Sequence, residues 1–208
     1  MKRLSFLFLV VSTLVLSGCA STQKLSDEDR ARAKTVAVNP KVQKGQLFLL
    51  APGGQNIGLM FGAVGGLAAS GVIEDDRKAF GTFVDKNGVS VEAIVRDEFQ
   101  KALRESGKVG IAPDGTTGVP VINVTVPQYG FGVTHLLSSN VVPVMQISCE
   151  MKDAGGKVLW SESERMLPSI ASPMQTTTWT QLHDNPKSIE EEWRKAARYL
   201  AQKVVQSL

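Results

Sequence analysis

Cysteine, histidine and aromatic residues are scarce in this chain, whose 208 residues include two cysteines, two histidines and 6% aromatic residues. The two histidines, His135 and His183, do not form an HExxH pattern or any other paired spacing of a metal site. The chain also lacks a GxSxG elbow and a glycine loop that ends in Lys-Ser or Lys-Thr. Residues 130–132, GFG, lack the third glycine of a dinucleotide fingerprint, so we expect a bend between strands there. The sequence therefore predicts no metal, no cofactor and no catalytic activity.

The first twenty residues carry the most specific pattern in the chain. Residues 1–3, MKR, are basic at positions 2 and 3, and residues 4–16 form an apolar run. Small residues follow at a possible cleavage site, and this combination is typical of a secretory signal peptide. Residues 16–19, LSGC, resemble the lipobox of bacterial lipoproteins. The resemblance implies cleavage before Cys19, diacylation of its thiol and acylation of its new amino terminus. In this family a residue other than aspartate after the cysteine, here Ala20, implies delivery to the outer membrane.

A lipidated N-terminus divides the chain into three expected parts. Two or more acyl chains attach a protein stably to a membrane, at about 0.8 kcal/mol per buried methylene. We expect residues 1–18 to be the removed signal peptide. Residues 19–34, which are polar and of mixed charge, would be the lipidated N-terminus and a flexible tether, and residues 35–208 a periplasm-facing domain. The alternatives are an ordinary signal peptide with a chance cysteine and an uncleaved anchor.

The charge and the remaining thiol limit what this domain can bind. Removal of the signal peptide takes away Lys2 and Arg3, so the formal charge falls from +3 to +1. A nearly neutral domain does not indicate nucleic acid as a partner. Cys149 would be the one thiol left, which excludes an internal disulfide, and its alternation with polar neighbours places it in an inert apolar core. The expected partners are the membrane, through the lipid, and other envelope proteins or further copies of the chain.

Hydrophobic periodicity predicts an α+β fold, an antiparallel sheet with two packed amphipathic helices. One helix is expected over residues 88–107, with Ser90 as its N-cap, and the other at the C-terminus, where Ser188 and Glu191 form a capping box. A turn over residues 153–156, DAGG, joins the last two strands into a hairpin. The strands are expected over residues 35–39, 46–51, 120–128, 143–152 and 157–164.

An apolar, glycine-rich segment interrupts this pattern at residues 57–71, IGLMFGAVGGLAASG. If the segment is helical, its small residues line one face and permit close approach by another helix. In water such a helix is weak, because each interior glycine costs about 0.5–1 kcal/mol relative to alanine. The stretch resembles the glycine zipper of some outer-membrane lipoproteins, such as conjugal surface-exclusion proteins. The candidate packing or assembly face is Gly58, Gly62, Gly66 and Ser70.

Three interpretations of this segment remain open. It packs within its own domain, it associates with another copy or a partner, or it enters the membrane. The 17 uncharged residues 57–73 would rise roughly 25 Å as a helix, which is short of the ~30 Å hydrocarbon core. The segment therefore does not indicate a lone membrane span.

A second candidate contact region is the polar loop over residues 173–187. Trp179 lies there among polar residues, followed by His183 and Asp184. An aromatic residue in a polar loop suits a partner-binding anchor, and the alternative is that it packs back onto its own domain.

The order of elements is similar to that of periplasmic domains in curli-secretion-type and penicillin-binding-protein-activator-type lipoproteins. That similarity implies a non-catalytic, lipid-anchored envelope lipoprotein that acts as an accessory or adaptor in an outer-membrane or periplasmic assembly. One alternative is an oligomeric, membrane-inserting pore or collar assembled through the glycine zipper. The other is a periplasmic module that binds a lipid or a cell-wall fragment in an apolar cleft between sheet and helices.

Overall fold

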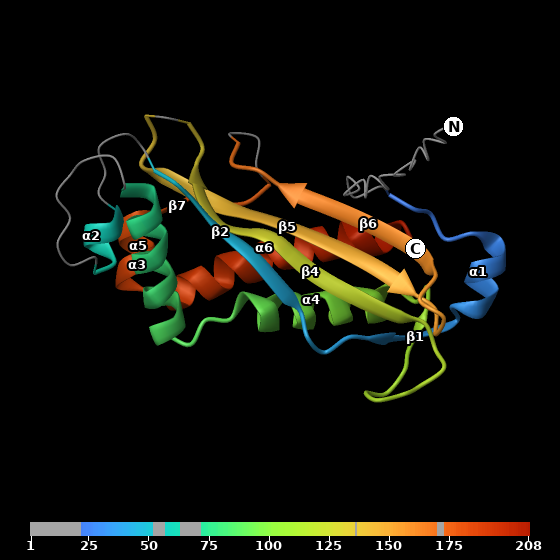
Figure 1. Cartoon of the computed structure of the whole chain (residues 1–208). Coiled ribbons are helices and arrows are strands. Elements are labelled where there is room, and N and C mark those ends of the chain that lie inside the picture. The colour runs from blue at the N-terminus through green and yellow to red at the C-terminus, as the bar shows by residue number, and fades with distance from the viewer. Residues whose placement is uncertain (1–21, 52–56, 63–71, 136, 170–172) are drawn as a thin grey trace, which may run out of the picture.

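The computed structural model describes residues 22–51, 57–62, 72–135, 137–169 and 173–208, with residues 72–74 described by their backbone alone. Within these ranges the chain is a mixed α+β fold with six helices and one seven-stranded sheet (Figure 1). The expected signal peptide and Cys19 lie outside the described residues, as do Gly66 and Ser70 of the glycine-rich segment.

The elements agree with most of the expected ones and add several more. In chain order they are α1 (Asp27–Arg32), β1 (Thr35–Val38), β2 (Gln43–Leu50), α2 (Ile57–Met60), α3 (Val72–Lys86), α4 (Val91–Ser106), β3 (Gly110–Ile111), β4 (Val121–Val133), β5 (Asn140–Lys152), β6 (Val158–Met166), β7 (Thr177–Thr178), α5 (Trp179–Asp184) and α6 (Lys187–Gln206). Among the described residues, no helix is both long enough and apolar enough to cross a membrane.

The sheet is antiparallel at its centre and parallel at one side. Strands β4, β5 and β6 form an antiparallel meander, which confirms the expected hairpin between β5 and β6. In contrast, β1 and β2 lie one after the other along β4 and run parallel to it, and β3 runs parallel to β1. The predicted antiparallel sheet is therefore confirmed for the pairs that β5 makes, whereas the parallel pairs of β1, β2 and β3 were not predicted. Parallel pairing needs a long crossover, and helices α3 and α4 provide it between β2 and β4.

Helices α4 and α6 cover one face of the sheet, and no helix of the described residues covers the other, which is called the open face below (Figure 1). Strand β5 shows the cause, because its residues alternate between the two faces. Met145, Ile147 and Met151 are fully buried against the helices, while Ser148 and Glu150 lie on the open face and are partly exposed. One covered and one solvated face is the usual arrangement for antiparallel strands.

The helix α4 is capped as predicted and is tied to α6 by a buried carboxylate. The Ser90 side chain accepts a hydrogen bond from the Ala93 amide, and the helix ends at Gly107, whose φ is +61°. Within α4, Glu98 is 4% exposed. Its carboxylate accepts from Arg194 at 3.2 Å and from Arg198 at 2.8 Å, so two cations of α6 neutralise the one buried charge of α4.

The predicted capping box of the C-terminal helix is wrong. The helix α6 begins at Lys187, after Pro186, which already has helical dihedral angles of −57° and −25° and makes no side-chain cap. The Ser188 hydroxyl lies inside the first turn and donates to the Asn185 carbonyl at 2.6 Å. A capping box forms instead at α5, between Thr178 and Gln181.

The GFG stretch lies within β4 and is not a bend between strands. At Gly130, φ is +144°, and a Cβ atom would lie 1.8 Å from the Phe48 carbonyl oxygen of β2. Glycine is therefore required for β2 to approach β4 this closely. The ladder shifts register between Thr125 and Gln128, which allows β4 to continue as far as Val133.

The expected flexible tether is part of the fold from Thr22 onward. Gln23 pairs with Ser161 on the outer edge of β6 through two backbone hydrogen bonds, of 2.9 and 3.0 Å. Leu25 is only 6% exposed. The sequence did not predict this contact, because the segment has no periodic apolar stripe. Backbone pairing and one apolar side chain hold it on the domain instead.

The segment then wraps around one end of the sheet as α1 (Figure 1). Asp29 is 6% exposed and receives the Lys157 ammonium at 3.2 Å. Hydrogen bonds from Ser26 and Lys157 lower the pKa of the Asp29 carboxyl. The Arg30 guanidinium donates to the Leu208 carbonyl at 2.8 Å, so the N-terminal segment contacts the last residue of the chain.

Candidate functional site

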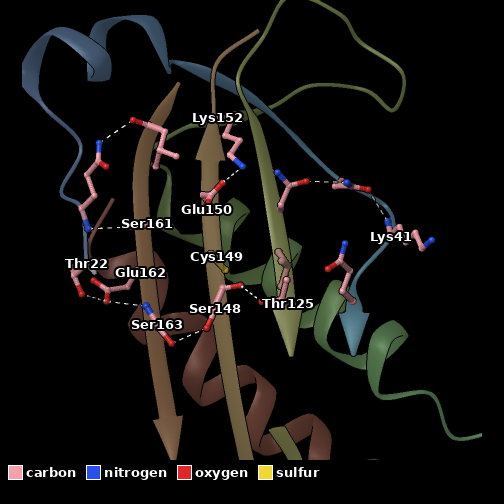
Figure 2. Close-up of a pocket in the computed structure, with 16 residues that line it drawn as sticks. Thr22, Lys41, Thr125, Ser148, Cys149, Glu150, Lys152, Ser161, Glu162 and Ser163 are labelled. Carbon is pink, nitrogen blue, oxygen red and sulfur yellow. Dashed lines mark hydrogen bonds and ion pairs between the residues drawn. The ribbon is translucent and has the colours of Figure 1, made fainter. Parts of the chain in front are cut away.

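The open face of the sheet carries a polar pocket of about 640 Å³ (Figure 2). Its floor comes from the outward residues of β4, β5 and β6, and its two sides from the N-terminal segment and the connection between β1 and β2. The polar residues that line it are Thr22, Gln23, Asn39, Lys41, Gln43, Asn123, Thr125, Ser148, Glu150, Lys152, Ser161, Glu162 and Ser163.

The register of the sheet places three hydroxyl groups in one row across the pocket floor. Thr125 pairs with Ser148, and Ser148 pairs with Ser163, so all three side chains lie on the same face. The Ser148 and Ser163 hydroxyls are 2.7 Å apart, and the Thr125 hydroxyl donates to the Ser148 carbonyl at 3.2 Å. These short side chains leave room above the sheet for another molecule.

The pocket is electrically balanced and has no aromatic lining residue among the described residues. Lys41 and Lys152 bring two positive charges, and Glu150 and Glu162 bring two negative ones. Lys152 and Glu150 form an ion pair with each other. The pocket therefore offers many hydrogen-bonding groups without net charge, which favours a polar surface of a partner over a nucleic acid or a strongly charged ligand.

The pocket is lined by several hydroxyl groups and one buried thiol. Neither described histidine lines it, and the Ser148 hydroxyl bonds to another serine. Cys149 lies at the base of the pocket and is 3% exposed. Its burial, and to a smaller extent the negative charge of Glu162, raise the pKa of its thiol, so the thiol stays protonated. The predicted position of Cys149 in the core is confirmed. In the described parts of the chain, no three His, Cys, Asp or Glu side chains come together as metal ligands.

The predicted anchor Trp179 packs back onto its own domain. It is 3% exposed, and its ring lies 6.1 Å from both Phe80 and Phe131 in edge-on contacts. Of the two interpretations of this residue, the structure therefore supports internal packing. The polar pattern of its loop did not show this, because the aromatic partners come from distant parts of the chain.

The prediction of a loop is wrong at these candidate residues, because Trp179, His183 and Asp184 all lie in the short helix α5. His183 and Asp184 remain at the surface. The His183 ring stacks on Phe83 with 5.6 Å between centroids, and its Nδ1 lies 3.0 Å from an Asp184 carboxylate oxygen. His135 is exposed in the connection between β4 and β5. The structure brings neither histidine into the polar pocket, so the loop and the pocket are separate features.

The glycine-rich segment begins inside the fold. Ile57 and Phe61 are 2% and 6% exposed, and the Phe61 ring lies 4.9 Å from Phe80 and also from Phe83 on α3. The short helix α2 ends at Met60, and Gly62 has a φ of +94°. A single helix that continues through Gly62 is therefore not formed.

The two described residues of the proposed glycine face, Gly58 and Gly62, lie in different environments. Gly58 is buried, and its amide donates to the Asp76 carboxylate at 2.6 Å. Gly62 is exposed, with no atom within 4 Å of where a Cβ would lie. The segment is thus anchored to its own domain at residues 57–61, while Leu59 and Met60 are 56% and 39% exposed.

The fold and the pocket define a mixed α+β domain with one helix-covered and one open polar sheet face. No known family model and no curated protein matches the chain. PelC from Paraburkholderia phytofirmans, solved as a dodecamer, is 16% identical over 90% of this chain and 94% of its own, with a TM-score of 0.40. XCC0632 from Xanthomonas campestris, a DUF330 protein, is 11% identical over 82% and 88%, with a TM-score of 0.37. A minor lipoprotein from Acinetobacter baumannii is 9% identical over 84% and 92%, with a TM-score of 0.33.

Proposed function

We propose that this chain is a non-catalytic, lipid-anchored lipoprotein of the bacterial outer membrane that faces the periplasm and acts as an adaptor in an envelope assembly. The observation that carries the proposal is the short distance in sequence between the lipobox cysteine and the fold. Only residues 20 and 21 separate Cys19 from Thr22, and Gln23 is already paired with β6.

This spacing would hold the domain against the membrane. Three residues of fully extended chain span at most about 11 Å. An acyl group on Cys19 would therefore keep Thr22, which lines the polar pocket, near the lipid head groups. A lipoprotein with a long tether can reach across the periplasm, whereas this one would act at the surface of its own membrane.

The open sheet face is the partner surface that this arrangement favours. Ser148 and Ser163 lie on it, and Thr22 and Gln23 form one of its sides, so the pocket and the anchor share one side of the domain (Figure 2). A partner bound there would itself lie at the membrane surface.

The first test is acylation of the full chain in cells. We expect incorporation of an alkynyl palmitate in the parent chain and none in Cys19→Ala, which should accumulate as the longer precursor. Cys149→Ala is the matched control and should be labelled normally, because Cys149 is buried. Normal labelling of Cys19→Ala would contradict the lipid anchor.

The adaptor role is tested by a photo-crosslinking residue placed at Ser163 in the pocket and, as a control, at Gln202 on the exposed side of α6. We expect one discrete adduct with an envelope protein from position 163 and none from position 202. Equal adducts from both positions, or none from position 163, would contradict a partner on the open sheet face.

A second candidate function is the oligomeric, membrane-inserting lipoprotein. Exposed apolar side chains favour it. They are Leu50, Leu59, Met60, Leu137 and Leu167, with exposures from 37% to 94%. Side chains of this kind can form a patch that contacts protein or lipid.

This candidate predicts a defined oligomer of the full chain in detergent that is lost in the double variant Leu59→Ser, Met60→Ser. Both side chains are exposed, so the double variant should keep its fold. A monomeric parent chain, or an oligomer unchanged by the double variant, would contradict assembly through this patch.

A further inference from the structure

A second cavity, of about 390 Å³, lies on the helix-covered side of the molecule, between α3 and the strands β2 and β4. It is distinct from the polar pocket, and the two share no lining residue. Its lining divides into an apolar floor and a charged rim. The floor is formed mainly by Leu47, Val84, Val89, Val91, Tyr129 and Trp193.

The floor of this cleft is fixed by two aromatic side chains. Trp193 is fully buried, and its indole N–H donates to the Gly130 carbonyl at 3.2 Å. The Tyr129 ring meets Trp193 edge-on, with 5.4 Å between centroids. Burial raises the pKa of the Tyr129 hydroxyl. The floor is therefore rigid and largely apolar.

The rim carries three cationic side chains, Lys44, Arg77 and Lys78, and one carboxylate, Asp85. Lys44 is held in place by Glu92, with 3.1 Å between its ammonium and the carboxylate. Lys78 is exposed. The rim residues carry three positive charges and one negative charge, and the Glu92 carboxylate beside Lys44 adds a second negative charge. The exposed Lys78 ammonium is the basic group that an anionic head group above the apolar floor could contact most directly.

Gly81 lines the cleft from α3, where a larger side chain would enter it. A Cβ atom there would meet only the Leu47 Cδ2 atom, at 3.7 Å, which is an ordinary contact. Alanine would fit and would favour the helix by about 0.5–1 kcal/mol, so the glycine weakens α3 without a steric need.

We propose that this cleft binds a single-chain amphiphile with an anionic head group. The acyl chain would lie on the floor formed by Leu47, Tyr129 and Trp193, and the head group would contact Lys44 and Lys78 at the rim. A volume of about 390 Å³ is near the lower end of the range for ligand pockets, about 300–1,000 Å³. It suits one acyl chain rather than a two-chain phospholipid. The head group is a carboxylate or a phosphate, as in a fatty acid or a lysophospholipid.

The test uses the full chain in membrane vesicles and diazirine-bearing C16 probes that differ only in the head group. The probes are a carboxylate, a monophosphate and an alcohol, and labelled peptides are mapped after photolysis. We expect the two anionic probes, or one of them, to label the peptides that contain Leu47 and Val84. The alcohol should label them at least about fivefold less, which corresponds to about 1 kcal/mol.

Two pairs of variants complete the test. Gly81→Leu should fill the cleft and reduce labelling of these peptides at least about tenfold, while Gly81→Ala, which adds one methyl group, should retain it. Lys78→Glu should reduce labelling by the anionic probes about fivefold. Lys101→Glu is its control, because it makes the same change of net charge on the exposed side of α4.

The outcomes separate the proposal from its rivals. A stronger signal with the carboxylate identifies a fatty acid, and a stronger signal with the phosphate identifies a lysophospholipid, and both support the proposal. Equal labelling by the alcohol would overturn the anionic head group. Labelling that persists in Gly81→Leu, or that is absent from the parent chain, would overturn the cleft as a binding site. Because Lys78 is a surface residue, its variant tests the proposal even if Gly81→Leu fails to fold.

Discussion

At the scale of single residues, Glu98 shows how one charge can join two helices. Burial alone would raise the pKa of this carboxyl, but hydrogen bonds and charge from Arg198 and Arg194 outweigh it, so the pKa is lowered. A carboxyl whose pKa is lower in the folded than in the unfolded state stabilises the fold above its unfolded pKa. That stabilisation is lost as the pH falls through the folded pKa. The contact between α4 and α6 should therefore weaken in acid.

We predict that Glu98→Gln lowers the free energy of unfolding at neutral pH by about 1–3 kcal/mol, because a charged acceptor is lost beside two cations. It should also make stability less dependent on pH below about 5. Urea unfolding at several pH values measures both effects. Glu105→Gln on the same helix is the control, since Glu105 and its partner Lys101 are exposed, and it should change stability by less than about 0.5 kcal/mol. An equal effect of both variants would contradict this account.

At the scale of elements, the close approach of β2 to β4 depends on one glycine. Strand β2 continues along β4 as far as the pair of Leu50 and Gly132, and Gly130 lies within this ladder. The carbonyl of the same residue accepts the Trp193 indole N–H, so the position also connects the sheet to α6. A side chain here would separate β2 from β4 and disturb that contact.

We predict that Gly130→Ala destabilises the chain by about 3 kcal/mol or more, because the new methyl group adds a backbone clash to a positive φ. Gly88→Ala is the matched control. Its φ is +69°, but nothing lies within 4 Å of the added atom, so only the conformational strain of about 1–2 kcal/mol remains. Thermal unfolding of the two variants measures the difference. Equal losses would mean that the contact with β2 is unimportant.

The elements that could be predicted from the sequence are those whose pattern is complete within one segment. Alternation in β5 and the caps of α4 identify these elements without knowledge of their neighbours. The direction of β1 and β2 could not be predicted, because it depends on the crossover through α3. Helix α3 was not predicted, because the charged residues 74–78 near its start were interpreted as the end of the preceding apolar segment. Of the polar pocket, no residue was predicted as a site, since its lining comes together only through the register of β4, β5 and β6.

At the scale of the whole molecule, the N-terminal segment closes one edge of the sheet. Gln23 pairs with Ser161 at the outer edge of β6 and α1 then passes around the end of the sheet to β1 at its opposite side. Residues 22–33 therefore belong to the folded domain, and in the proposed lipoprotein this segment would set the orientation of the domain relative to the membrane. Release of the segment should lengthen the tether without unfolding the core.

We predict that Gln23→Pro releases the segment, because proline cannot donate the backbone hydrogen bond to the Ser161 carbonyl. Trypsin should then cleave the full chain after Lys24 at least about tenfold faster. Gln23→Ala is the control, since it keeps the backbone pair and removes only the side-chain bond to the Val158 carbonyl. Equal cleavage rates in the two variants would contradict the pairing.

The pairing of Gln23 with Ser161 also bears on the order in which the protein matures, because 138 residues separate the two partners. If the chain is exported from its N-terminus, as the proposed lipoprotein requires, residues 22–33 would have no sheet to join until β6 had crossed the inner membrane. Contacts between such distant residues form late in folding. The proposed cleavage site before Cys19 would thus stay accessible to the acylating and cutting enzymes throughout export. The domain would take up its fixed position at the membrane only after both modifications can be complete.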